Sequence, residues 1–164
     1  TDRNLAQRKI KYDFLKSALK NDVIAMWKLA KLSNASGDYE TALKWYKRIN
    51  SLGGQNALSA ANNIGNIYFK KSHNEFGNQR IRSINRAIEF YYKAAQGGLT
   101  LSKKNLGIVY EQLEDWSKAL SWFEIAAYEG DATSKIKLEK LRSRPSSTPI
   151  FSWQQAEEIG RAHV

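Results

Sequence analysis

The sequence predicts an all-α superhelical solenoid of about three helix-hairpin repeats with flanking half-repeats. Three observations lead to this prediction. Apolar residues recur at helical spacing, three stretches of the chain share one pattern, and Gly or Asn follows the helical stretches at matching places. The chain has 164 residues, only two Pro and no Cys. A chain of this length and composition has enough apolar material for one domain with a core.

The repeat appears as two series of small residues, one in each helix of a hairpin. Their positions are Ala30, Gly65 and Gly107 in the first series and Ala42, Ala87 and Ala119 in the second. The first and third pairs are both 12 residues apart, whereas the middle pair is 22 apart. The middle repeat therefore holds about ten extra residues, and without them the period is that of a helical hairpin. A Gly inside a helix is expected where a neighbouring helix approaches closely.

The first predicted helix, residues 3–20, has the position of a second hairpin helix without a first. Asn21 follows it, and Asn is the usual substitute for Gly in the left-handed conformation that ends a helix. Residues 3–21 are therefore a half-repeat. Its buried side is expected to hold Leu5, Ile10, Phe14, Leu15, Ala18 and Leu19.

Three complete repeats are predicted near 22–54, 56–98 and 100–130. Their helices are expected at 22–34, 38–51, 56–71, 82–96, 100–113 and 115–129. The glycines Gly53-Gly54, Gly97-Gly98 and Gly130 end the second helices. Residues 131–142 repeat a first helix and close the repeat domain, 1–142, with a second half-repeat. The extra residues form an insertion, 71–85, which is expected to be a long loop.

At these residues the chain resembles the tetratricopeptide and Sel-like repeat superfamily of helical hairpins. The spacing of 12 in the first and third units matches the tetratricopeptide form. The Sel-like signature is matched by Leu106-Gly107, Tyr110, Lys118-Ala119, Trp122-Phe123, Ala126-Ala127 and Gly130. The chain departs from the pattern in the insertion, at Ala30, which replaces Gly, and at Ser33, which stands where Tyr68 and Tyr110 stand in the other units.

The resemblance implies a non-enzymatic scaffold or adaptor that binds a protein segment on a concave face lined by the first helices. Projected onto this chain, that face holds Trp27, Lys28, Lys31, Asn62, Asn63, Asn66, Phe69, Lys70, Lys104, Asn105, Ile108, Lys137 and Lys140. Amides can hold an extended backbone and ammonium groups favour carboxylates, so an acidic segment is the expected partner. The alternative is that these polar residues form only a solvated helix face.

Some tetratricopeptide domains clamp a terminal carboxylate with Lys and Asn. Asn66, Asn105 and Lys137 match such a clamp, whereas Asn62 and Thr133 stand where basic residues are expected. The resemblance to the Sel-like family also implies bacterial secretion-associated or toxin-neutralising roles.

The net charge of +10 leads to an alternative function, binding of nucleic acid or of an anionic surface through a basic stripe. The insertion contributes to this charge, and it is either a loop that contacts the partner or a tolerated addition. No nucleic-acid motif accompanies the charge, so a protein partner is preferred. Zero Cys and two isolated His exclude disulfides, thiol nucleophiles and zinc fingers, and no cofactor or metal is expected. The lack of Cys is compatible with cytoplasm or periplasm.

After the repeats, Pro145 and Pro149 indicate a linker at 143–151. Ser152 and Gln155 form a capping-box pattern at the start of the last segment, 152–164, which is expected to be a short helix or tail. This segment could cover the end of the solenoid or mediate self-association. No apolar run is long enough to span a bilayer.

Overall fold

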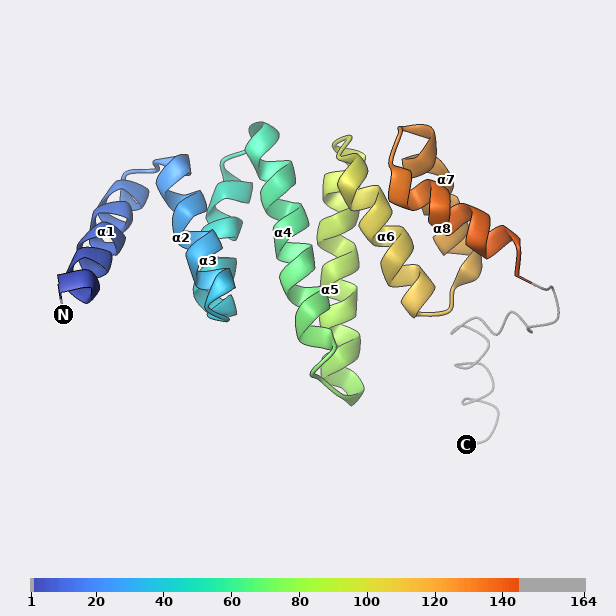
Figure 1. The fold of residues 1–164 in the computed structure, drawn as a ribbon, viewed down its shortest axis with the longest axis horizontal. Coiled ribbons are helices and arrows are strands. Elements are labelled where there is room, and N and C mark those ends of the chain that lie inside the picture. Colours follow the sequence, from blue (N-terminus) through green and yellow to red (C-terminus); the bar gives the residue numbers. More distant parts are fainter. Residues whose placement is uncertain (1, 145–164) are drawn as a thin grey trace. The chain divides into compact units, whose positions relative to one another are not determined.

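The computed structural model describes residues 2–144, and this part of the chain consists of helices joined by short turns, with no β-strand. Figure 1 shows the order of the helices along the chain. The eight helices are α1 (Asp2–Leu19), α2 (Val23–Ala35), α3 (Tyr39–Ser51), α4 (Gly54–Ser72), α5 (Gly77–Gln96), α6 (Thr100–Gln112), α7 (Trp116–Tyr128) and α8 (Ala132–Arg142). The predicted all-α class is confirmed, and the helix bounds lie close to the predicted ranges everywhere except between α4 and α5. The predicted tail at 152–164 lies outside the described residues, as does most of the linker.

The chain divides into two compact units, residues 1–90 and 91–164, with the boundary inside α5. In unit 1 (residues 1–90), α1 packs on α2, α2 on α3 and α3 on α4. Its core combines small residues with large ones, and Ala30, Ala42, Tyr46 and Ile49 are at most 2 % exposed. In unit 2 (residues 91–164), α6 packs on α7 and α7 on α8.

The core of unit 2 shows why a Gly stands in the middle of α6. A Cβ added at Gly107 would lie 2.6 Å from two carbons of the Phe123 ring, which is closer than real Cβ contacts come. Phe123 and Ala119 are fully buried beside Leu141 of α8. The absent side chain therefore lets α6 and α7 approach closely, which offsets the intrinsic cost of Gly in a helix.

The two units repeat the same helices at an offset of 77 residues. α6 and α7 begin and end 77 residues after α2 and α3. The turns repeat as well, because Asn21 and Gly98, which are also 77 residues apart, both have a positive φ. Asp38 and Asp115 hold equivalent N-cap positions, and each accepts a hydrogen bond from the backbone N–H three residues later.

The prediction of a long loop at 71–85 is wrong. α4 continues to Ser72 and α5 already begins at Gly77, so the extra residues lengthen both helices of the hairpin and leave four residues between them. Gly77 has a φ of +54° at this turn. Ser72 and Ser83 are buried where the extended helices lie, so the extension is packed rather than loose. Phe76, at the tip, is 86 % exposed.

The predicted buried side of α1 is mostly exposed. Ala18 is fully buried and Phe14 packs against the core of unit 1, but Leu5, Ile10 and Leu19 are between 52 % and 64 % exposed. Leu15 is exposed as well. The reason is that α1 packs on α2 alone among the described helices, so only one narrow side of it is covered.

Candidate protein-interaction surface

In unit 1 the predicted cations of α2 and α4 lie near aromatic rings. The Lys28 Nζ lies 4.6 Å from the centroid of the Phe14 ring, and the Lys70 Nζ lies 5.4 Å from that of Tyr39. Lys31 is exposed one turn further along α2. Among the described residues, none of these three lysines forms an ion pair with a carboxylate. A cation held over a ring keeps its charge available to an approaching anion.

Two aromatic side chains of the predicted site are half-buried beside these lysines in the sequence. The Trp27 ring packs edge-on against Tyr46 at 5.2 Å, and the Phe69 ring packs edge-on against His73 at 4.9 Å. Burial raises the pKa of Tyr46, and a hydrogen bond from Asn63 partly offsets this. Trp27 and Phe69 therefore support the packing of the helices while part of each ring stays accessible.

The three predicted asparagines of α4 differ in accessibility. Asn62 is 2 % exposed, so it belongs to the interior and cannot touch a partner while the helix stays packed. Its polar groups have partners within the protein. Asn63 is half-buried and bound to Tyr46, whereas Asn66 is exposed. The prediction that Asn62 lies on the interaction face is wrong, because this residue lies on the buried side of α4.

In unit 2 the predicted cations are paired with acids. The Lys137 Nζ lies 2.6 Å from a carboxylate oxygen of Glu111, and the Lys104 Nζ lies 3.9 Å from one of Asp131. Ile108 packs against the core of unit 2, and Asn105 is half-buried with partners inside the protein. Of the predicted residues in this unit, only Lys140 is exposed and carries no ion pair among the described residues.

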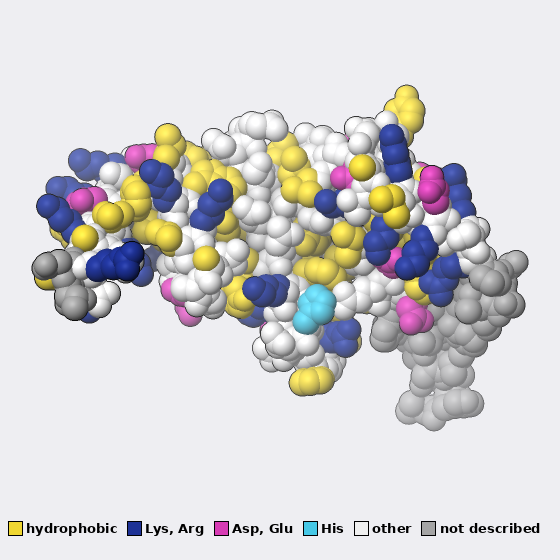
Figure 2. All heavy atoms as spheres, in the orientation of Figure 1, with side chains coloured by type: hydrophobic (Ala, Val, Ile, Leu, Met, Phe, Trp, Pro, Cys, Tyr) yellow, Lys and Arg dark blue, Asp and Glu magenta, His cyan; other side chains and the backbone are white. Residues whose placement is uncertain are grey.

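The charge of the chain is concentrated in unit 1. Residues 1–90 contain 16 Lys and Arg against 7 Asp and Glu, whereas residues 91–164 contain 10 against 9. The described ion pairs follow the same division, since only Arg86–Glu89 lies in unit 1 and five lie in unit 2. Figure 2 shows one face of the molecule, with Lys and Arg side chains over α1, near the tip of the α4–α5 hairpin and over unit 2, where Asp and Glu side chains lie among them. An anionic partner is therefore attracted mainly to unit 1.

Sequence reasoning missed the aromatic rings beneath the lysines. Tyr39 begins α3 directly after the N-cap Asp38, and Phe14 comes from the predicted first half-repeat. Phe14 was expected on a buried side and Tyr39 had no predicted role, because the spacing of residues in the sequence does not show that a lysine from another helix lies over a ring. In the described part of the chain, no group of His, Asp and Glu could hold a metal ion, and no helix is long and apolar enough to cross a membrane.

Of the comparisons with known proteins, only the structural one bears on the fold. The sequence matches no protein-family profile and no curated protein. The structure is similar to the N-terminal domain of stress-induced protein-1 from C. elegans, with a TM-score of 0.54 and 20 % sequence identity. The match covers 77 % of this chain and 98 % of that domain. Together with the successive packing of helices in each unit, this similarity shows a tetratricopeptide-like helical-repeat fold.

Proposed function

We propose that this protein is a scaffold that binds an acidic segment of a partner protein on the exposed side of α2 and α4 in unit 1. The tetratricopeptide-like fold typically serves protein interaction rather than catalysis, which supports the general class. The observation that carries the specific site is the contrast between the units. The lysines of α2 and α4 lie over rings or stand alone, whereas Lys104 and Lys137 of unit 2 are paired with acids.

Each residue type on this surface has a role in the proposed binding. The ammonium groups of Lys28, Lys31 and Lys70 attract carboxylates, and no internal acid has to be displaced first. The exposed amide of Asn66 can both donate to and accept from an extended peptide backbone. The accessible parts of Trp27 and Phe69 offer apolar contact, and aromatic side chains are enriched in protein interfaces. The partner is therefore an acidic segment that also carries apolar side chains.

The experiment compares two triple variants that remove the same amount of charge. The first is Lys28→Gln, Lys31→Gln and Lys70→Gln in unit 1, and the matched control is Lys104→Gln, Lys137→Gln and Lys140→Gln in unit 2. Affinity for a fluorescein-labelled peptide of Asp and Glu interrupted by Leu is measured by fluorescence anisotropy. Circular dichroism checks that both variants keep the helical fold.

The unit 1 variant is expected to bind at least tenfold more weakly than the parent chain, and the control within about twofold. Equal losses in both variants would move the site away from α2 and α4. An oligonucleotide of equal charge that binds more tightly than the peptide, and that the unit 1 variant no longer holds, would favour the alternative function of nucleic-acid binding. The more specific proposal of a bacterial secretion-associated or toxin-neutralising role is tested by which protein the chain retains from the lysate of its own organism after nuclease treatment.

A further inference from the structure

A second candidate site lies in unit 1 on the other side of α4, where the extended α4–α5 hairpin forms a shallow groove. Tyr68 and Lys71 line this groove from α4, and Arg82, Ser83 and Arg86 line it from α5. At 3.6 residues per turn, Tyr68 and Lys71 point away from Asn66 and Lys70 of the first surface. The groove therefore does not belong to the site proposed above, and it exists because of the extra residues in this hairpin.

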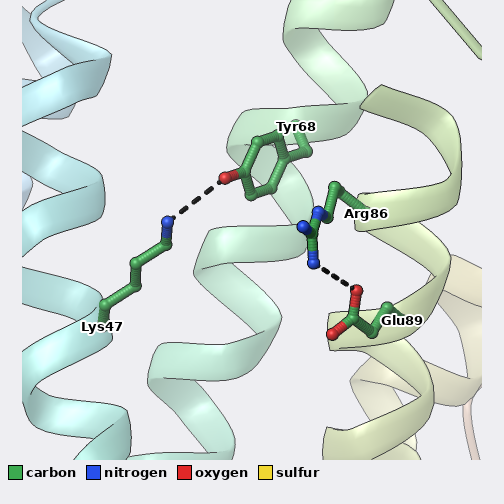
Figure 3. Close-up of polar contacts among 4 residues, drawn as sticks. All are labelled: Lys47, Tyr68, Arg86 and Glu89. Carbon is green, nitrogen blue, oxygen red and sulfur yellow. Dashed lines mark hydrogen bonds and ion pairs between the residues drawn. The ribbon is translucent and has the colours of Figure 1, made fainter. Parts of the chain in front are cut away.

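Tyr68 lines the groove, and its hydroxyl is directed toward Lys47 of α3. The Lys47 Nζ donates a hydrogen bond to the Tyr68 hydroxyl oxygen at 3.3 Å, and the Tyr68 ring stacks on Phe90 at 6.2 Å. Figure 3 shows Tyr68 between Lys47 of α3 and Arg86 of α5. The hydroxyl accepts from Lys47, so its own proton is free to be donated. Among the described residues it has no acceptor.

Two lysines lie near the Tyr68 ring, and two arginines line the groove together with Tyr68. Besides donating to the hydroxyl, Lys47 has its Nζ 5.8 Å from the ring centroid of Tyr68, and the Nζ of Lys71 is 6.0 Å from it. Arg82 forms no ion pair with any described residue. Arg86 is paired with Glu89 at 2.9 Å, but both side chains are about 60 % exposed, and such surface pairs contribute little stability and exchange readily.

Ser83 adds a neutral hydroxyl to the lining of the groove. The residue is 7 % exposed and lines the groove together with Lys71 and Arg82. Its hydroxyl can donate a hydrogen bond to an acceptor oxygen of a ligand in the groove.

One acid, Glu75, also lines the groove, near the turn of the hairpin. It accepts a weak hydrogen bond from the Gln79 amide at 3.4 Å, and its second oxygen is buried without a partner. The negative charge of Glu75 repels an anion in the groove. Replacing Glu75 with a neutral residue should therefore strengthen anion binding, whereas replacing a cation should weaken it.

We infer that this groove binds a phosphorylated side chain of a protein partner. The groove is lined by the cations Lys71, Arg82 and Arg86 and by two residues with a hydroxyl, Tyr68 and Ser83. Their donors exceed what the two oxygens of a single carboxylate can accept, whereas a phosphate monoester has three terminal oxygens and a charge near −2. A nucleic-acid strand requires cations spaced along a track, whereas these three cations line one groove.

The first experiment is a peptide array with phosphoserine, phosphothreonine or phosphotyrosine at the centre of randomised flanks, beside the same array without phosphate and with Glu at the centre. The full chain is the probe. We expect the best phosphopeptide to bind at least tenfold more tightly than its unphosphorylated and Glu counterparts. An array without phosphate-dependent binding overturns the inference.

The second experiment places the phosphate in the groove. In the ¹⁵N-labelled chain, the best phosphopeptide should shift the backbone amides of Arg82, Ser83 and Arg86. Arg82→Gln and Tyr68→Phe should each weaken binding at least fivefold and Glu75→Gln should strengthen it, while the control Lys16→Gln on α1 should leave it within twofold. Equal weakening by Lys16→Gln, or inorganic phosphate binding as tightly as the phosphopeptide, contradicts a phosphorylated side chain as the ligand.

The outcome is independent of the acidic-segment surface. The unit 1 variant at Lys28, Lys31 and Lys70 leaves every residue of the groove intact, so it is expected to bind the phosphopeptide as the parent chain does. Loss of both interactions in that variant would merge the two sites and contradict a separate groove.

Discussion

At the scale of single residues, the turns between helices constrain the backbone strictly. Among residues 2–144, two residues other than Gly have a positive φ, Asn21 at +65° and Glu114 at +59°. Asn tolerates this region, whereas a Glu there is strained by its Cβ. At the equivalent turn 77 residues earlier, Gly37 has a φ of +81°. The turn at Glu114 therefore carries a backbone strain that the turn at Gly37 avoids.

Glu114→Gly is expected to stabilise the protein by about 0.5–1 kcal/mol, because Gly removes the strain but adds freedom to the unfolded chain. The melting temperature should rise by about 2–3 °C for a chain of this length. Thermal unfolding followed by circular dichroism measures it. The reverse change in the other unit, Gly37→Ala, should lower the melting temperature. A lower melting temperature for Glu114→Gly would show that its side chain contributes more than its backbone costs.

Gly107→Ala is expected to lower the melting temperature by several degrees and Gly107→Leu to prevent cooperative folding. The added Cβ meets the Phe123 ring at 2.6 Å, and overpacking of this kind costs about 1–3 kcal/mol, more than the better helix propensity of Ala returns. The double variant with Phe123→Leu provides the control. It should lose less than the sum of the two single changes, since the smaller side chain leaves room. If the stability losses of the two single changes simply add, the contact between residue 107 and the Phe123 ring is not the cause of the destabilisation.

The single-residue signals differ in how far they could be interpreted from the sequence. The role of Asn21 followed from its place nine residues before Ala30, which matches the place of Gly98 before Gly107. Asn62 could not be placed in the same way. It is adjacent to the half-buried Asn63, and one residue of helix turns a side chain by about 100°, which separates an interior position from a surface one.

At the scale of elements, the α4–α5 hairpin shows what a repeat pattern leaves out. The spacing of the small residues located ten extra residues, but it gave no information on their conformation. The sequence from Lys71 to Arg82 contains no Pro, its one Gly lies at the turn, and several residues after the turn, such as Gln79, Arg80 and Arg82, favour helices. That composition is compatible with longer helices as well as with a loop. The expectation of a loop followed from the family period instead of from local propensity.

α1 shows the opposite limit. Its apolar residues were placed on a buried side from their spacing alone, but burial also needs a neighbouring element. Among the described helices α1 packs on α2 alone, which covers Ala18 and part of Phe14 and leaves Leu5 and Leu19 exposed.

Acid should destabilise the helices through their N-caps. The hydrogen bond with Thr41 lowers the pKa of Asp38. Burial alone would raise the pKa of Asp131, but hydrogen bonding with Ser134 outweighs it and the pKa is lowered. Groups whose pKa is lowered by folding stabilise the protein fully above their unfolded pKa of about 4, and this contribution is lost as the pH falls below it.

The double variant Asp38→Asn and Asp131→Asn should therefore keep a melting temperature near that of the parent chain at pH 7, because Asn is also a good N-cap. Between pH 5 and pH 3 its melting temperature should fall less than that of the parent. Melting curves at each pH measure the difference. Superimposable acid profiles would show that other carboxylates, such as Glu129, whose pKa Lys103 and Thr100 lower, dominate.

At the scale of the whole molecule, the two units share a fold but differ in charge. Among the described residues, five cations of unit 2 are paired with acids, whereas in unit 1 only Arg86 is. The repeat pattern in the sequence determines where helices pack, and it makes no demand on the surface charge. The surface charge therefore gives information on binding that the fold does not. The net charge of each unit can be counted from the sequence, whereas the ion pairs can be identified only in the structure.

Binding of the acidic peptide should depend steeply on salt, because exposed charges are screened over about 10 Å at 0.1 M ionic strength. Affinity is expected to fall at least fivefold between 50 mM and 300 mM NaCl. The variant with Lys28, Lys31 and Lys70 changed to Gln should show a flatter dependence, and the unit 2 control should keep the slope of the parent chain. Fluorescence anisotropy at each salt concentration measures this. A parent affinity that does not change with salt would make apolar contacts the main source of binding.

The offset of 77 residues means that the chain contains its own reference set of variants. Three pairs of equivalent positions hold different residues, namely Ala30 and Gly107, Asp22 and Leu99, and Gly37 and Glu114. Each residue is compatible with the same kind of helix or turn in its own unit. Exchanging the residues of such a pair asks whether a difference belongs to the turn or helix itself or to its surroundings. Engineering of this chain can therefore begin from residues that one of its own units already holds at the equivalent position.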